Sequence, residues 1–238
     1  MSPLLTDPQT YLSLLTLTAL EIVLGVDNIL FISVVASRLP KADRELVRKL
    51  GVSLALFGRL GLLFSISLVL SMTKPLFTFG DHTFSGRDLV LGLGGLFLIY
   101  KATQEIFNHL EAAAPVQREV KALSMRSAVL QILVLDLIFS LDSIITAIGL
   151  VSNLAIMAIA IIISVGIMLY SSGAVSDFLD EHPSMKVLGL AFLLLIAVLL
   201  VAECFGYHVP RGYVYFALSF SVMVEVINIQ YQKRMRHK

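Results

Sequence analysis

The chain has 238 residues, of which 57% are hydrophobic and only 15% are charged, and its mean hydropathy is +0.88. This composition is too apolar for a soluble domain, so it excludes most soluble enzymes and DNA-binding proteins. The 18 Lys and Arg residues nearly balance the 17 Asp and Glu residues, and the single Cys204 excludes an intramolecular disulfide. The composition predicts an integral membrane protein without a nucleic-acid partner.

Seven apolar segments are long enough to cross a hydrocarbon core of about 30 Å as helices. In chain order they are 11–35, 52–72, 89–106, 127–148, 154–171, 187–205 and 213–229. No basic residue precedes the first segment and no A-x-A site follows it, so we expect it to stay in the mature protein. The predicted fold class is all-α: a polytopic membrane protein with seven transmembrane helices in a single transmembrane domain, 1–238.

Basic residues are concentrated after the first and third segments and in the C-terminal tail. They are Arg38, Lys41, Arg44, Arg48, Lys49, Arg118, Lys121, Arg126, Lys233, Arg234, Arg236 and Lys238. Because cytoplasmic loops of membrane proteins are enriched in Lys and Arg, we expect these three regions in the cytoplasm. That orientation places the N-terminus outside and the C-terminus in the cytoplasm.

Two stretches of the chain repeat one acidic pattern. The stretch 21–29 reads E-I-V-L-G-V-D-N-I and the stretch 136–144 reads D-L-I-F-S-L-D-S-I, with two carboxylates six positions apart in both. The segments 11–106 and 127–205 therefore form two predicted repeats of three helices, with the helix 213–229 outside them. An odd number of spans inverts the second repeat, which is a plan typical of secondary transporters.

Four acidic residues, Glu21, Asp27, Asp136 and Asp142, fall in the middle of predicted spans. Each costs about 2.5 to 3.5 kcal/mol at the bilayer centre, so none is expected to face lipid. Arg59 is the intramembrane base, and its charge neutralises at most one of the four.

Six residues on a straight helix place the two acids of one motif on different faces. Gly25 offers a place for the first helix to break or unwind, with Ser140 as a weaker counterpart in the fourth, and the sequence does not tell whether either helix breaks. A break of this kind lets Glu21, Asp27 and Asn28 converge. Carboxylate, amide and hydroxyl oxygens suit hard cations, and they do not separate Mn²⁺ from Mg²⁺ or Ca²⁺. The alternative is structural: protonated acids, Asn28 and Ser143 can hydrogen-bond between helices.

The motifs E-I-V-L-G-V-D-N-I-L-F-I-S at 21–33 and D-L-I-F-S-L-D-S-I-I-T-A at 136–147 resemble those of the TerC family of bacterial membrane proteins, as does the stretch 208–217. The resemblance covers the whole chain and fits the short branch without cytoplasmic domains. It implies Mn²⁺ export across the inner membrane. The metal ligands that it implies are Glu21, Asp27, Asn28, Asp136, Asp142 and Ser143. Many relatives have D-S-I-P-A in the second motif, and Ile145 and Thr146 stand here in place of that proline. Arg59, Glu225 and Asn228 are accessory candidates.

The leading functional prediction is a secondary transporter that exports a divalent cation by proton antiport. Its expected partners are the metal ion and the lipid bilayer, with no permanently bound cofactor and no prediction of oligomeric state. The alternative is a membrane scaffold or partner subunit that assists metal loading or metal-stress resistance. The third, an intramembrane hydrolase, is disfavoured because the chain lacks both the G-x-G-D and H-E-x-x-H motifs.

Overall fold

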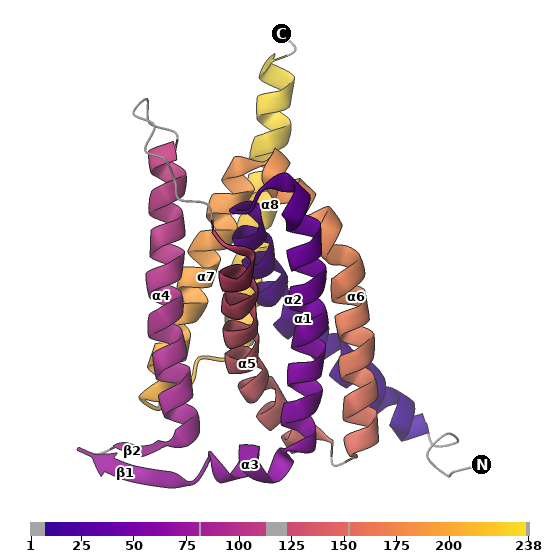
Figure 1. Ribbon diagram of the computed structural model, residues 1–238, viewed down its shortest axis with the longest axis vertical. Coiled ribbons are helices and arrows are strands. Elements are labelled where there is room, and N and C mark those ends of the chain that lie inside the picture. The colour runs from indigo at the N-terminus through magenta and orange to yellow at the C-terminus, as the bar shows by residue number, and fades with distance from the viewer. Residues whose placement is uncertain (1–7, 81, 113–122, 152, 237–238) are drawn as a thin grey trace. The chain divides into compact units, whose positions relative to one another are not determined.

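The computed structural model describes residues 8–80, 82–112, 123–151 and 153–236. This part of the chain forms eight helices and one two-stranded sheet, and Figure 1 labels them. The helices are α1 (Pro8–Ser37), α2 (Lys41–Phe64), α3 (Ile66–Ser71), α4 (Gly86–Ala112), α5 (Met125–Leu150), α6 (Leu154–Glu181), α7 (Pro183–Cys204) and α8 (Arg211–Arg236). The strands are β1 (Pro75–Phe79) and β2 (His82–Ser85). The all-α, polytopic fold class is confirmed.

Six helices within the described ranges are long and apolar enough to cross a membrane: α1, α4, α5, α6, α7 and α8. The count of seven predicted spans is not confirmed, because the segment 52–72 is divided between α2 and α3. Ser65 lies between them with φ −92° and ψ 31°, and its backbone N–H donates to the carbonyls of Gly61 and Leu62. This bond geometry ends α2. In addition, α2 begins at Lys41, so its first turns carry charged side chains.

Both acidic motifs lie on continuous helices, so neither helix breaks at Gly25 or Ser140. Gly25 instead packs against Met168 of α6, where a side chain at position 25 would collide with the Met168 sulfur. Ser140 lies inside α5, and its hydroxyl donates to the backbone carbonyl of Asp136 at 2.5 Å, one helical turn earlier. The small residues of the two motifs therefore serve packing and a local hydrogen bond rather than unwinding.

The hairpin β1–β2 was not predicted from the apolar pattern. Its strands pair antiparallel, and the rings of Phe77 and Phe84 stack with centroids 5.3 Å apart. Aromatic and β-branched residues favour strands, and Gly80 supplies the positive φ of 63° that follows β1. The hairpin leads directly into the first turn of α4, where Ser85 N–H and hydroxyl both donate to Asp88 Oδ2.

The chain divides into two compact units. The first comprises Met1–Val90 and Lys121–Asp177, and the second comprises Leu91–Val120 and Phe178–Lys238. In the first unit, α2 packs mainly on α5, and α1 packs on both helices. Gly51 permits the close approach of α2 to α5, since a Cβ there would lie 2.9 Å from Ile132 Cγ2. The predicted inverted repeats, 11–106 and 127–205, stay a prediction.

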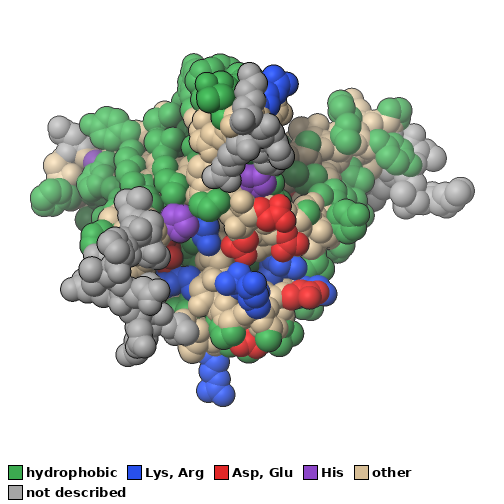
Figure 2. Space-filling view, turned by 90° about the horizontal axis from the view of Figure 1, so that it is seen from above, with side chains coloured by type: hydrophobic (Ala, Val, Ile, Leu, Met, Phe, Trp, Pro, Cys, Tyr) green, Lys and Arg blue, Asp and Glu red, His purple; other side chains and the backbone are tan. Residues whose placement is uncertain are grey.

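The basic turn between α1 and α2 closes the C-terminal end of α1. Arg44 donates from Nε to the carbonyl of Leu39 at 2.9 Å and from Nη2 to the carbonyl of Ser37 at 2.8 Å. Cations at helix C-termini satisfy carbonyls and complement the helix dipole. Figure 2 shows Lys, Arg, Asp and Glu side chains gathered on part of the face seen from above. Arg118, Lys121 and Lys238, which also supported the orientation, lie outside the described residues.

In the second unit, Gly95 permits α4 and α7 to pack closely. A Cβ at Gly95 would lie 2.8 Å from the carbonyl oxygen of Ala197, which is backbone and has little freedom to move away. We expect Gly95→Ala to lower stability by about 1 to 3 kcal/mol, as overpacking does. Thermal unfolding of the purified protein in detergent would measure the change.

The matched control is Gly166→Ala in α6, where a new Cβ meets nothing within 4 Å. In a helix interior this change is expected to raise stability, by about 0.4 to 1 kcal/mol. Equal unfolding temperatures for the two variants would contradict the close α4–α7 packing.

Candidate metal-binding site

Three charged side chains from three helices meet in the interior of the first unit. Arg59 of α2 lies between Glu21 of α1 and Asp136 of α5, with Nη1 2.8 Å from Glu21 Oε2 and Nη2 2.7 Å from Asp136 Oδ1. The three residues are only 2%, 3% and 3% exposed for Glu21, Arg59 and Asp136, respectively. We call these three residues the buried charged cluster.

Asp136 accepts hydrogen bonds from two further side chains beside the cluster. Asn28 Nδ2 donates to Asp136 Oδ1 at 3.2 Å, and the Ser140 hydroxyl lies 3.2 Å from Asp136 Oδ2. Arg59 Nε adds a bond to Oδ1 at 3.2 Å. Buried charges persist only when their hydrogen-bonding capacity is used, and the Asp136 carboxylate meets this condition.

Glu21 and Asp136 occupy equivalent positions in the two acidic motifs, since each is the first acid of its stretch. The structure therefore brings together one carboxylate from each motif. Arg59 contacts both, whereas the sequence suggested one partner. If both acids are ionised, one guanidinium faces two carboxylates, and the cluster carries a net charge of −1.

The second acid of the α5 motif lies apart from the cluster. Asp142 forms an ion pair with Arg87 in the first turn of α4, and its backbone carbonyl accepts a bond from the Thr146 hydroxyl. Six residues of α5 separate Asp142 from Asp136, a rise of about 9 Å along the helix. The sequence did not predict Arg87 as a partner of Asp142, because Arg87 lies in a segment between two predicted spans. The hairpin that precedes α4 brings it to α5.

The remaining predicted ligands of the first unit are buried as well. Asp27 is 3% exposed and Ser143 is 4% exposed, and the Ser143 hydroxyl donates to the backbone carbonyl of Ser140 at 3.3 Å. Among the residues that the structure describes, no three His, Cys, Asp or Glu side chains are grouped so as to hold a metal ion. The four predicted acidic ligands thus do not form one such group, and the role of all six residues as ligands stays a prediction.

The accessory candidates Glu225 and Asn228 lie on α8 in the second unit. Asn228 Nδ2 donates to Glu225 Oε2 at 3.4 Å, one turn apart on the same helix. Their contribution to an ion pathway stays a prediction.

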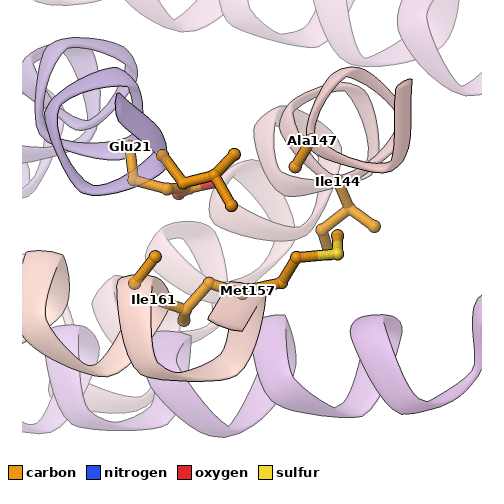
Figure 3. A pocket seen from close by; sticks show the side chains of 7 residues that line it. Glu21, Ile144, Ala147, Met157 and Ile161 are labelled. Carbon is orange, nitrogen blue, oxygen red and sulfur yellow. The ribbon is translucent and has the colours of Figure 1, made fainter. Parts of the chain in front are cut away.

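A small cavity adjoins Glu21. Leu17 and Glu21 of α1 line it together with apolar side chains of α5 and α6, and Figure 3 shows Ile144, Ala147, Met157 and Ile161 around it. Its volume of about 10 Å³ is on the order of what one water molecule needs. Glu21 is the charged residue of this lining, so the residue that pairs with Arg59 also borders the cavity.

Comparison with known proteins agrees with this reading of the chain as a membrane protein. The family model described as "Integral membrane protein TerC family" matches residues 6–238. A UPF0053 protein of Haemophilus influenzae is 47% identical over 231 residues, which cover 97% of this chain and 98% of that protein.

Two relatives from Escherichia coli strain K12 carry names that give their location. The UPF0053 inner membrane protein YgdQ is 48% identical over 97% of both chains. The UPF0053 inner membrane protein YoaE is 47% identical over 98% of this chain but only 46% of its own length. No solved structure matches the chain. The names and the six apolar helices support a multi-pass protein of the inner membrane. Since the family model spans nearly every residue, the chain belongs to the TerC family of integral membrane proteins.

Proposed function

We propose that this protein is a secondary transporter that exports a divalent cation across the inner membrane, with Mn²⁺ as its substrate and proton antiport as its driving reaction. The observation that carries the proposal is the buried charged cluster. It joins the first acid of each repeated motif, Glu21 and Asp136, at one point inside the helical unit. Transporters built from two repeats bind their substrates at such places between the repeats.

The chemistry of the cluster suits a hard cation. Its acidic members offer carboxylate oxygens, and Asn28 and Ser140 add an amide and a hydroxyl beside them. Oxygen ligands accommodate Mn²⁺, Mg²⁺ and Ca²⁺ alike. The choice of Mn²⁺ follows from the family resemblance.

The export direction requires an energy source. A cell that is negative inside opposes efflux of a divalent cation by about 4.6 kcal/mol per 100 mV, since each charge contributes about 2.3 kcal/mol. Carboxylates that bind either a proton or a metal ion supply an exchange reaction, because protons and metals compete for the same oxygens. In this proposal the N-terminus lies outside and the C-terminus lies in the cytoplasm.

Flux measurements on the purified full chain in proteoliposomes test the proposal. With an imposed proton gradient, we expect Mn²⁺ flux above that of protein-free vesicles, and we expect it to exceed the flux of Mg²⁺ and Ca²⁺. Flux that does not depend on the proton gradient would refute proton antiport but not the transport function. Absence of flux for all three ions would refute the transporter.

A membrane partner subunit that assists metal loading is the second candidate. The closed ion pairs of the buried charged cluster favour it, because a guanidinium held by two carboxylates also serves as a structural link among α1, α2 and α5. A copurifying partner together with absent ion flux in the proteoliposomes would establish this function. The proposal assigns no catalytic step to the chain, and an intramembrane hydrolase is the third and least supported alternative.

A further inference from the structure

Arg59 holds a positive charge at the place where two carboxylates from the two motifs meet. We propose that Arg59 is a tethered competitor of the transported cation: its guanidinium occupies the position between Glu21 and Asp136 that the divalent ion takes during transport. This inference rests on the proposed transport function and assigns a specific part of it to Arg59. In the structure the site is closed by the protein's own cation.

The geometry shows why the guanidinium can stand in for an ion. Its two terminal nitrogens point to different carboxylates, at 2.8 Å from Glu21 Oε2 and 2.7 Å from Asp136 Oδ1. A guanidinium stays protonated under all ordinary conditions, so it cannot leave this position by losing its proton. It leaves only by moving away, when another cation or a pair of protons takes over the carboxylates.

Charge balance favours a divalent ion as the replacement. Two ionised carboxylates with Arg59 carry a net charge of −1. The same carboxylates with a divalent ion, and with Arg59 withdrawn, carry a net charge of 0. A monovalent ion in the same place leaves −1. A divalent ion therefore balances the charge of the two carboxylates, which neither Arg59 nor a monovalent ion does, and uncompensated charge is costly in a buried site.

Two glycines flank Arg59 near the C-terminal end of α2, and the first of them, Gly58, packs against Leu137 of α5. Gly58 precedes Arg59 and Gly61 follows it by two residues, and glycine is a poor helix former in a helix interior. A Cβ at Gly61 would meet nothing within 4 Å, so there is open space beside this turn. The helix ends at Phe64, five residues after Arg59, and Ser65 caps it. These features provide for a local movement that withdraws the guanidinium.

The test compares Mn²⁺ binding with Mn²⁺ transport in the same variants. Binding to the purified full chain in detergent is measured from the electron paramagnetic resonance signal of free Mn²⁺, and transport is measured in proteoliposomes. For Arg59→Gln we expect affinity at least tenfold tighter than wild type together with flux at least tenfold lower, because no competitor expels the bound ion. Arg59→Lys should lie between them, since a single ammonium does not span both carboxylates as a planar fork does.

The matched control is Lys49→Gln, which removes one positive charge from the same helix. Lys49 pairs with Glu45 on the surface, and its side chain is 61% exposed. We expect wild-type affinity and wild-type flux from this variant.

The inference is overturned if wild type transports Mn²⁺ but Arg59→Gln binds it with unchanged or weaker affinity. If Arg59→Gln fails to fold, Arg59→Lys decides, and affinity equal to or weaker than wild type overturns the inference in that case too. If wild type neither binds nor transports Mn²⁺, Mg²⁺ or Ca²⁺, the proposed function is refuted, and the inference about Arg59 is refuted together with it.

Discussion

Asp136→Asn is expected to abolish Mn²⁺ flux and to destabilise the protein. The carboxylate of Asp136 accepts hydrogen bonds from Arg59, Asn28 and Ser140, so the neutral amide removes the charge on which three donors converge. Arg59 then keeps Glu21 as its carboxylate partner. Removing one partner of a buried ion pair lowers the free energy of unfolding by about 3 to 5 kcal/mol. A loss of about 3 kcal/mol in the free energy of ion binding corresponds to an affinity that is weaker on the order of a hundredfold.

The measurements are Mn²⁺ flux in proteoliposomes and thermal unfolding in detergent. Asp180→Asn is the matched control, because it makes the same chemical change in a pair with Lys186 whose atoms lie 3.5 Å apart and whose Asp180 side chain is 35% exposed. An exposed pair contributes at most about 1 kcal/mol, so this variant should transport and unfold like wild type. Wild-type flux in Asp136→Asn with lowered stability would make the buried charged cluster purely structural and would place the ion pathway elsewhere in the protein.

The burial of the acidic motifs was predictable from the sequence. Glu21, Asp27, Asp136 and Asp142 fall in the middle of apolar segments, and the cost of a carboxylate in lipid requires that they face protein. The structure agrees, with each of the four at most 5% exposed. Arg59 was identified as a charge partner for the same reason, since it lies in an apolar segment where a base needs a carboxylate.

The tertiary contacts of the motifs were not predictable from a single sequence. A glycine such as Gly25 permits unwinding and also permits close packing, and only the position of Met168 on α6 decides between them. Arg87 reads as a loop residue, and its contact with Asp142 depends on the hairpin that precedes α4. Helical spacing correctly separates the two acids of one motif, but it does not tell which acids of different helices meet.

Replacing Arg87 and Asp142 separately is expected to lower stability similarly, whereas only the replacement of Asp142 is expected to abolish transport. The pair links α5 to the first turn of α4, with side chains 16% and 7% exposed for Arg87 and Asp142, respectively. Arg87 is also fixed through its backbone, whose N–H donates to the carbonyl of Met72 at 2.9 Å. A double-mutant cycle with Arg87→Gln and Asp142→Asn should give a coupling energy of about 1 to 3 kcal/mol in thermal unfolding, as contacting charged residues do.

Flux measurements show whether Asp142 binds the transported ion or only pairs with Arg87 to hold α4 against α5. If its carboxylate binds the ion, Asp142→Asn loses the flux, whereas Arg87→Gln retains it because the carboxylate remains and loses only its neutralising partner. Arg87→Lys, which keeps the charge, serves as the control and should resemble wild type in both measurements. Equal losses of flux in Arg87→Gln and Asp142→Asn would show instead that the pair only anchors α4 to α5. In that case the ion pathway would run through the acids at the buried charged cluster, and the second acid of the α5 motif would owe its burial to Arg87 rather than to a metal ion.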